Sequence, residues 1–139
     1  MKILIMGLPG SGKTTLASKL TQIMNARWIN ADEVRKKFND WDFSRQGVLR
    51  QAKRMGDLAD SSQEKIIIAD FICPYEDGRK LFNPDYIIWM DTIQKGRVPT
   101  FDRDFEKPKN YNFRVKDNKD NTGIENKIIE DIKNSLNNK

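Results

Sequence analysis

The chain has 139 residues, enough for one hydrophobic core, so we expect a single domain over residues 1–139. Hydrophobic residues make up 37% of the chain and charged residues 32%, and the apolar residues fall in short regular runs, which excludes wholesale disorder. One cysteine and no histidine exclude an internal disulfide, a multi-cysteine or histidine zinc site, and histidine-based catalysis.

The formal charge is +5, because 25 Lys and Arg stand against 20 Asp and Glu. This charge favours an anionic ligand, but the basic residues are spread along the chain, so a small phosphate-bearing molecule is favoured over nucleic acid, which stays an alternative. No apolar run is long enough for a signal peptide or a membrane span. We therefore expect a cytoplasmic protein without a membrane partner; its oligomeric state is open, a homodimer included.

Apolar runs and amphipathic stretches alternate along the chain. The predicted strands are Lys2–Met6, Arg27–Asn30, 66–69, Tyr86–Met90 and Phe113–Val115. The predicted helices are Lys13–Met24, about 32–38, a stretch capped by Ser44 with Val48, Ala52, Met55 and Ala59 on its buried face, and 124–136. Residues 94–110 carry a glycine and two prolines and are predicted to form a loop or lid. This order predicts an α/β fold with a central parallel sheet.

A glycine-rich turn between the first strand and the first helix fits the pattern G-x-x-x-x-G-K-S/T. Its backbone N–H groups and the positive end of the helix can hold phosphate oxygens. Lys13 can follow the γ-phosphate through transfer, and the Thr14 hydroxyl is the expected Mg²⁺ ligand. The pattern predicts a P-loop that binds ATP and Mg²⁺; the alternative is an ordinary glycine turn. The predicted nucleotide-binding residues are Gly7, Pro9, Gly10, Ser11, Gly12, Lys13, Thr14 and Thr15.

Two carboxylates stand where predicted strands end. Asp32 follows the second strand and Asp70 follows the third. Ligands bind beyond the carboxyl ends of parallel strands, and phosphoryl transfer needs a group that takes the proton of the acceptor hydroxyl. We predict that Asp32 is this base and that Asp70 holds Mg²⁺ through its water shell. The alternatives are a helix N-cap for Asp32 and a turn residue for Asp70.

With these residues the chain resembles the adenylylsulfate kinases, P-loop enzymes that phosphorylate the 3′-hydroxyl of adenosine 5′-phosphosulfate. Residues 7–15, 29–54 and 71–75 carry the resemblance. The family's Asp-Gly-Asp-x-x-Arg is matched by Asn-Ala-Asp-Glu-Val-Arg at 30–35, and its Phe-Ser follows at 43–44. Its Phe-Ile-Ser-Pro-Tyr is matched at 71–75, with Cys73 in place of the serine. The resemblance implies a three-layer P-loop kinase fold.

The resemblance also implies roles for acceptor-side residues. Asp32 and Arg35 would grip the acceptor as catalytic residues together with Lys13. Phe43 would stack on the acceptor base, and the backbone of Ile72 and Cys73 would help to seat it. The Cys73 side chain itself is predicted to be small and buried.

The chain departs from the family on the next helix and in the lid. The family's Arg and Asn align with Val48 and Gln51, and Arg50 can take over by a small shift. Arg50 and Arg54 on one helix face are predicted to bind an acceptor phosphate or sulfate, and the alternative is a solvated face. The lid is shortened to residues 94–108. Arg97 and Arg103 in it either close over the phosphates or stay exposed, and Phe101 and Phe105 are predicted to pack it onto the body.

Polynucleotide 5′-hydroxyl kinases offer a second resemblance. They pair a Gly-x-Pro-Gly-Ser-Gly-Lys loop with Ile-Asn-x-Asp-x-x-Arg, which residues 29–35 also match. The sequence therefore predicts an ATP-dependent kinase of a hydroxyl group, with adenylylsulfate as the leading acceptor. A polynucleotide or modified-nucleoside acceptor is the alternative, and a nucleotide-binding module without efficient turnover is the alternative from another class.

Overall fold

The computed structural model describes residues 1–95, 99–116 and 123–137. Its strands form one five-stranded sheet in the order β2-β3-β1-β4-β5, and each neighbouring pair is parallel. The strands are β1 (Lys2–Met6), β2 (Arg27–Asn30), β3 (Ile67–Asp70), β4 (Tyr86–Met90) and β5 (Phe113–Val115). The predicted α/β fold with a central parallel sheet is confirmed.

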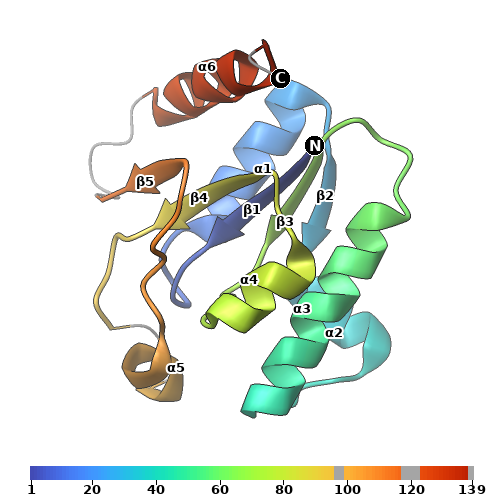
Figure 1. Ribbon diagram of the computed structural model, residues 1–139, viewed down its shortest axis with the longest axis vertical. Helices are drawn as coiled ribbons and strands as arrows, with labels where there is room; N and C mark the ends of the chain where they lie inside the picture. Colours follow the sequence, from blue (N-terminus) through green and yellow to red (C-terminus); the bar gives the residue numbers. More distant parts are fainter. Residues whose placement is uncertain (96–98, 117–122, 138–139) are drawn as a thin grey trace.

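Helices cover both faces of this sheet, as Figure 1 shows, with α1 and α6 on one face and α2, α3 and α4 on the other. The helices are α1 (Lys13–Met24), α2 (Ala31–Phe38), α3 (Arg45–Asp60), α4 (Glu76–Phe82), α5 (Pro99–Asp104) and α6 (Ile124–Asn137). Among the described residues, no helix combines the length and the apolar character that a membrane crossing requires.

The alternation of side chains along β1 explains the two cores. Ile3 and Ile5 point into the cluster beneath α1 and α6, whereas Leu4 and Met6 point into the cluster beneath α2, α3 and α4. All four side chains are fully buried, as expected for the central strand of a parallel sheet covered on both faces.

The connections of β1 and β3 run in opposite directions across the sheet. The chain leaves β1 through α1 toward β2, and it leaves β3 through α4 toward β4 on the far side of β1. Their carboxyl ends therefore flank a switch point, where an open α/β sheet forms its ligand crevice.

Two short helices differ from the sequence prediction. α4 was not predicted, because its seven residues contain Gly78 and are too few to show a clear helical period. The six-residue α5 lies inside the segment predicted as a loop or lid. β3 begins one residue later than predicted and includes Asp70, so the alternative that Asp70 is a turn residue is wrong.

We expect that Phe82→Ala will lower the free energy of unfolding by about 3–5 kcal/mol, because it leaves a cavity in the core. Phe82 is 0% exposed and makes an edge-to-face contact with Phe71, with ring centroids 5.5 Å apart. The matched control is Leu81→Ala on the same helix, because Leu81 is 43% exposed. Urea unfolding followed by circular dichroism measures both, and equal losses for the two variants would contradict this packing.

Candidate active site

A cavity of about 450 Å³ opens at the switch point. The P-loop lines one part of it, and other parts are lined by α2 and the turn after it, the start of α3, the segment after β3 and Phe101. Twelve of the residues singled out from the sequence line this one cavity: Pro9, Gly10, Gly12, Lys13, Thr14, Thr15, Asp32, Arg35, Phe43, Asp70, Ile72 and Cys73. The fold therefore brings the predicted phosphate side and the predicted acceptor side together.

The P-loop is shaped by glycines at crowded or left-handed positions. A Cβ on Gly7 would lie 2.7 Å from the carbonyl oxygen of Met90, so no other residue fits there without movement of the backbone. Gly12 has φ of 100° and caps α1 without a side-chain hydrogen bond, which leaves the first backbone N–H groups of α1 to a ligand. The Lys13 ammonium donates a hydrogen bond to the carbonyl oxygen of Leu8 at 2.9 Å, across the turn.

Asp70 lies beside the first turn of α1. Its carboxylate accepts hydrogen bonds from Thr14 Oγ1 at 3.0 Å, from Trp28 Nε1 at 2.7 Å and from the Asn30 amide at 3.2 Å. Burial raises the pKa of Asp70, while these hydrogen bonds and the nearby Lys13 charge oppose the rise. Trp28 is partly buried, packs against the core beneath α1 and α6, and also orients this carboxylate.

The Thr14 and Asp70 oxygens suit Mg²⁺, which prefers oxygen ligands. Within the described ranges, no group of three or more Asp, Glu, Cys or His side chains could form a metal cage. The residues therefore fit a Mg²⁺ ion that takes the remaining ligands from water and phosphates, as in nucleotide-dependent kinases.

Asp32 lies in the first turn of α2 and lines the cavity. The N-cap of this helix is Asn30, whose side-chain oxygen accepts a hydrogen bond from Glu33 N at 3.1 Å. The alternative that Asp32 is the N-cap is therefore wrong. Because Asn30 satisfies the helix end, the Asp32 carboxylate is left to face a ligand.

Arg35 is 5% exposed and fixes the irregular turn that follows α2. Its guanidinium donates hydrogen bonds to the carbonyl oxygens of Asp40 at 2.9 Å and Asp42 at 3.4 Å, and it lies 4.4 Å from the ring centroid of Phe43. Burial lowers the pKa of Arg35, and the charge of Asp40 opposes this shift. Arg35 therefore holds the turn in the position that directs Phe43 toward the cavity.

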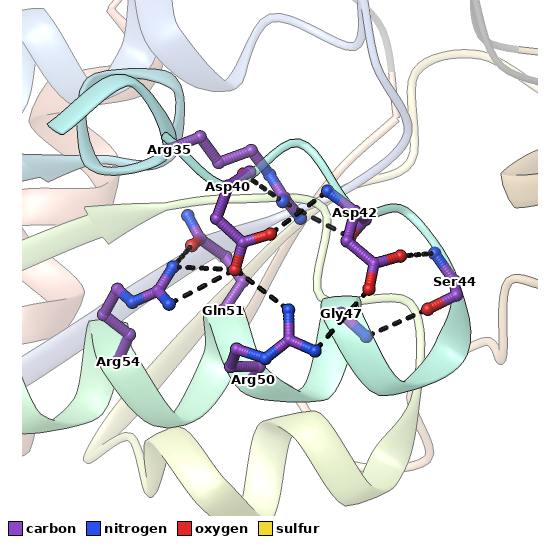
Figure 2. A network of polar contacts seen from close by, with 8 residues as sticks. All are labelled: Arg35, Asp40, Asp42, Ser44, Gly47, Arg50, Gln51 and Arg54. Carbon is purple, nitrogen blue, oxygen red and sulfur yellow. Dashed lines mark hydrogen bonds and ion pairs between the residues drawn. The ribbon is translucent and has the colours of Figure 1, made fainter. Parts of the chain in front are cut away.

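The Asp40 carboxylate forms ion pairs with two more arginines, Arg50 and Arg54, as Figure 2 shows. It accepts hydrogen bonds from Arg50 at 3.0 Å, from both terminal nitrogens of Arg54 at 3.2 Å, and from the backbone N–H of Asp42. The hydrogen bond from Arg50, followed by that from Asp42 N–H, lowers the pKa of Asp40 to about 2. Arg50 also pairs with Asp42 and does not line the cavity, so the structure does not bring it to the other predicted acceptor residues.

Gln51 lines the cavity although sequence reasoning gave it no role. Its side chain is buried, its Nε2 donates to the carbonyl oxygen of Ala31 at 3.1 Å, and its Oε1 accepts from Arg54 at 3.3 Å. Asp40 therefore orients the amide of Gln51 through Arg54. Val48, one turn earlier on α3, adds an apolar contact surface to the same wall. Val48 and Gln51 are three residues apart and so lie on one face of the helix, and this spacing was the sequence signal that could have placed them together at the site.

Arg79 was also missed, because it lies on the helix that the sequence did not reveal. It is 4% exposed, and it donates hydrogen bonds to the carbonyl oxygens of Cys73 at 3.1 Å and Pro74 at 3.3 Å. Cys73 has a left-handed φ of 45°, and this backbone is held in place by the two hydrogen bonds. Burial raises the pKa of Cys73 to about 12, so its thiol stays protonated, in agreement with the predicted buried side chain.

The described part of the lid contributes one aromatic ring to the cavity and packs another against the body. Phe101 of α5 is buried, lines the cavity and makes an edge contact with Phe43, with centroids 5.8 Å apart. The ring of Phe105 packs against Arg79. The Arg103 side chain is 76% exposed and pairs with Asp104, away from the cavity lining. Arg97 lies outside the described residues.

A family model described as adenylylsulphate kinase matches residues 1–85. The chain belongs to this family. The match includes both sides of the cavity, from the P-loop to the segment after β3, and the resemblance predicted from the sequence is confirmed. No match was found among curated protein sequences.

Three solved structures similar to this family member are described as kinases. The Mycobacterium tuberculosis APS kinase CysC in complex with AMPPNP and APS has a TM-score of 0.81 at 17% identity, over 95% of this chain and 96% of that one. A gluconokinase from Sinorhizobium meliloti 1021 has a TM-score of 0.72 at 13% identity, over 99% and 94% of the two chains. Shikimate kinase from Aquifex aeolicus has a TM-score of 0.68 at 17% identity, over 98% of each. These likenesses establish the kinase fold.

We expect that Asp40→Asn will loosen the turn between α2 and α3, because the neutral amide holds Arg50 and Arg54 less strongly. Backbone hydrogen exchange in residues 39–47 should become about five- to tenfold faster. The control is Asp57→Asn, since Asp57 pairs with Lys53 on the exposed side of the same helix. Unchanged exchange in the Asp40 variant, measured by mass spectrometry, would show that Arg35 alone holds the turn.

Proposed function

We propose that this family member transfers the γ-phosphate of ATP to a hydroxyl group of a small acceptor. The observation that carries the proposal is the shared cavity, in which Lys13 and Thr14 of the P-loop face the same space as Asp32 and Arg35. A kinase needs this arrangement, because catalysis of phosphoryl transfer is mostly positioning and charge stabilisation.

On the donor side, the backbone N–H groups of the P-loop would hold the phosphates of ATP, and Lys13 would stabilise the charge on the transferring group. Thr14 and Asp70 would hold Mg²⁺, Asp70 through water. When bound, the ion neutralises phosphate charge. We also propose that the protein acts in the cytoplasm as a single kinase domain.

On the acceptor side, Asp32 is the proposed general base. The acceptor oxygen forms a bond to the γ-phosphorus, its proton passes to the Asp32 carboxylate, and the bond between the γ-phosphorus and the bridging oxygen breaks to release ADP. Arg35 would orient the acceptor, with its charge held in place by the carbonyl oxygens of Asp40 and Asp42.

The proposed acceptor is the 3′-hydroxyl of adenosine 5′-phosphosulfate. The family match over residues 1–85 supports it, and Phe43, Ile72 and Cys73 line the cavity where an acceptor base and ribose would have to fit. The polar amide of Gln51 and the apolar side chain of Val48 line the same wall, so an uncharged nucleoside acceptor is the second candidate.

Transfer of labelled γ-phosphate from Mg·ATP tests the acceptor directly. Adenylylsulfate, a 5′-hydroxyl oligonucleotide and a panel of nucleosides are assayed side by side. Labelled product with adenylylsulfate alone supports the proposed acceptor. Product with an oligonucleotide or nucleoside instead moves the activity to that acceptor, and slow ATP hydrolysis that no acceptor stimulates would indicate a binding module.

We expect that Asp32→Asn will lower the turnover number for transfer by about 10²-fold or more, because the amide cannot take the acceptor proton. The affinity for ATP should stay within about twofold, since Asp32 makes no proposed contact with the phosphates. Lys13→Ala is the contrasting variant and should weaken ATP binding and turnover together. Calorimetry gives the affinities and labelled transfer gives the rates; a fully active Asp32→Asn protein would refute the base assignment.

A further inference from the structure

A buried arginine joins two segments that lie on the proposed acceptor side. Arg79 of α4 is 4% exposed, and its guanidinium donates hydrogen bonds to backbone carbonyl oxygens of both segments. After β3, the acceptors are Cys73 at 3.1 Å and Pro74 at 3.3 Å; after α5, the acceptor is Glu106. The other terminal nitrogen pairs with the Glu76 carboxylate. One planar group therefore connects the segment after β3 to the segment after α5.

Both of these segments build the wall of the cavity. Cys73 and Pro74 line it directly. On the other segment, the N–H of Phe105 donates to the carbonyl oxygen of Phe101 at 3.0 Å, so these residues lie one helical turn apart, and the Phe101 side chain lines the cavity. The Arg79 guanidinium lies 5.5 Å from the ring centroid of Phe105. The position of the Phe101 ring therefore depends on Arg79 through the turn between the two aromatic residues.

The segment after β3 is held at its beginning by the P-loop rather than by Arg79. The N–H of Gly7 donates to the carbonyl oxygen of Ile72 at 3.4 Å. The next residue, Cys73, turns the chain with a left-handed φ of 45°, and its carbonyl oxygen accepts from Arg79. Loss of Arg79 should therefore release the end of this segment, while the hydrogen bond to the P-loop stays in place.

Stability alone is a weak reason for a charge at this position. A buried ion pair loses hydration, and its replacement by well-packed apolar residues is often neutral or stabilising. An apolar side chain cannot donate to three carbonyl oxygens in fixed directions. Arginine can, because its five N–H donors form a planar fork, whereas the donors of a lysine ammonium diverge from one atom. The contacts of Arg79 therefore fit a role in placing backbone.

We propose that Arg79 is a positioning residue of the acceptor site, which sets the Cys73 backbone and the Phe101 ring in one fixed relation. The inference rests on the proposed function, in which the acceptor binds in this part of the cavity. Arg79 itself does not line the cavity, so it acts through these two walls. Binding of the acceptor then depends on Arg79, and binding of ATP to the P-loop does not.

The single cysteine of the chain gives a direct test of the segment after β3. Cys73 is buried, so the rate at which its thiol reacts with Ellman's reagent in the free protein reports how often this segment opens. We expect Arg79→Met to speed this reaction by about tenfold or more. The charge of Arg79 lowers the pKa of Cys73, so its loss alone would slow the reaction by leaving less thiolate. A faster reaction therefore reports opening.

Hydrogen exchange tests the segment after α5 in the same free protein. The N–H of Phe105 bonds to Phe101 and the N–H of Glu106 bonds to Pro74 at 2.8 Å, so both amides report on this segment. Arg79→Met should speed their exchange by about tenfold or more and leave α1 unchanged. The matched control is Lys80→Met, since Lys80 is an exposed neighbour on the same helix, and it should change neither readout.

Two further variants sharpen the test. Arg79→Lys keeps the charge and should restore little, because one ammonium does not reproduce the fork. Glu76→Gln keeps the guanidinium and removes the charge that pairs with it, so both rates should rise by about two- to threefold in a protein that folds even where Arg79→Met does not. Its control is Asp77→Asn, because the exposed Asp77 pairs with Arg45 instead.

Transfer kinetics measure the effect on the acceptor. We expect Arg79→Met to raise the KM for adenylylsulfate, or for whichever acceptor of the panel the unmodified protein phosphorylates, by about tenfold or more. The Kd for Mg·ATP, measured by calorimetry, should stay within about twofold. Thermal unfolding checks that each variant is folded at the assay temperature, so a general loss of structure is recognised by its equal effect on both ligands.

The outcomes separate this inference from the proposed function. A faster reaction of Cys73 without faster exchange at residues 105–106, or the reverse, overturns the link between the two walls. Full rescue by Arg79→Lys, or an unchanged KM although both walls open, overturns the positioning role. If the unmodified protein phosphorylates no acceptor, the proposed function fails, and the labelling and exchange rates, which need no substrate, still decide whether Arg79 holds the two walls together.

Discussion

The parallel pairing of β1 with β3 is the constraint on which the site depends. Its register sets Ile5 beside Asp70, so the chain leaves β1 into the P-loop at the same level at which β3 ends in a carboxylate. The two strands are neighbours in the sheet, and Asp70 therefore comes within hydrogen-bonding distance of Thr14 in the first turn of α1. A slip of one residue would turn the Asp70 side chain to the opposite face of the sheet and separate the two oxygens proposed to hold Mg²⁺.

The proposed acceptor side is held by charges rather than by strand pairing. Arg35 and Arg79 are both almost fully buried, and each donates to backbone carbonyl oxygens of an irregular segment that lines the cavity. Such segments have no ladder or helix to satisfy their carbonyl groups, and a guanidinium with five N–H donors can satisfy several at once. The three arginines around the turn after α2 are balanced by Asp40 and Asp42, so the turn is fixed without a large excess of positive charge.

Sequence reasoning succeeded where the signal is local. The P-loop is a contiguous pattern, and β1, β3 and β4 are mainly apolar runs. Asp70 ends β3 and Asp32 follows β2 closely, and a parallel sheet brings these strand ends to one edge. It failed where the outcome depends on distant partners. Arg50 was assigned to the acceptor because nothing in the sequence shows that Asp40, ten residues earlier, neutralises it. Gln51 and Arg79 were passed over because their importance comes from contacts with Ala31 and Cys73, and α4 is too short for its period to be read.

A second cavity, of about 310 Å³, shares Gly12 and Thr15 with the first one and differs from it in how the family match covers its lining. The model for adenylylsulphate kinase ends at residue 85, so it includes the P-loop and the acceptor side but none of Met90, Val115, Ile124 and Glu125. The residues proposed to hold the phosphates and the acceptor therefore lie in the part of the chain with a family pattern, whereas β4, β5 and α6 follow it and supply walls of the second cavity. The lining of the second cavity shares only Gly12 and Thr15 with that of the first, so residues beyond the family match can vary there while the P-loop and Asp32 keep their positions.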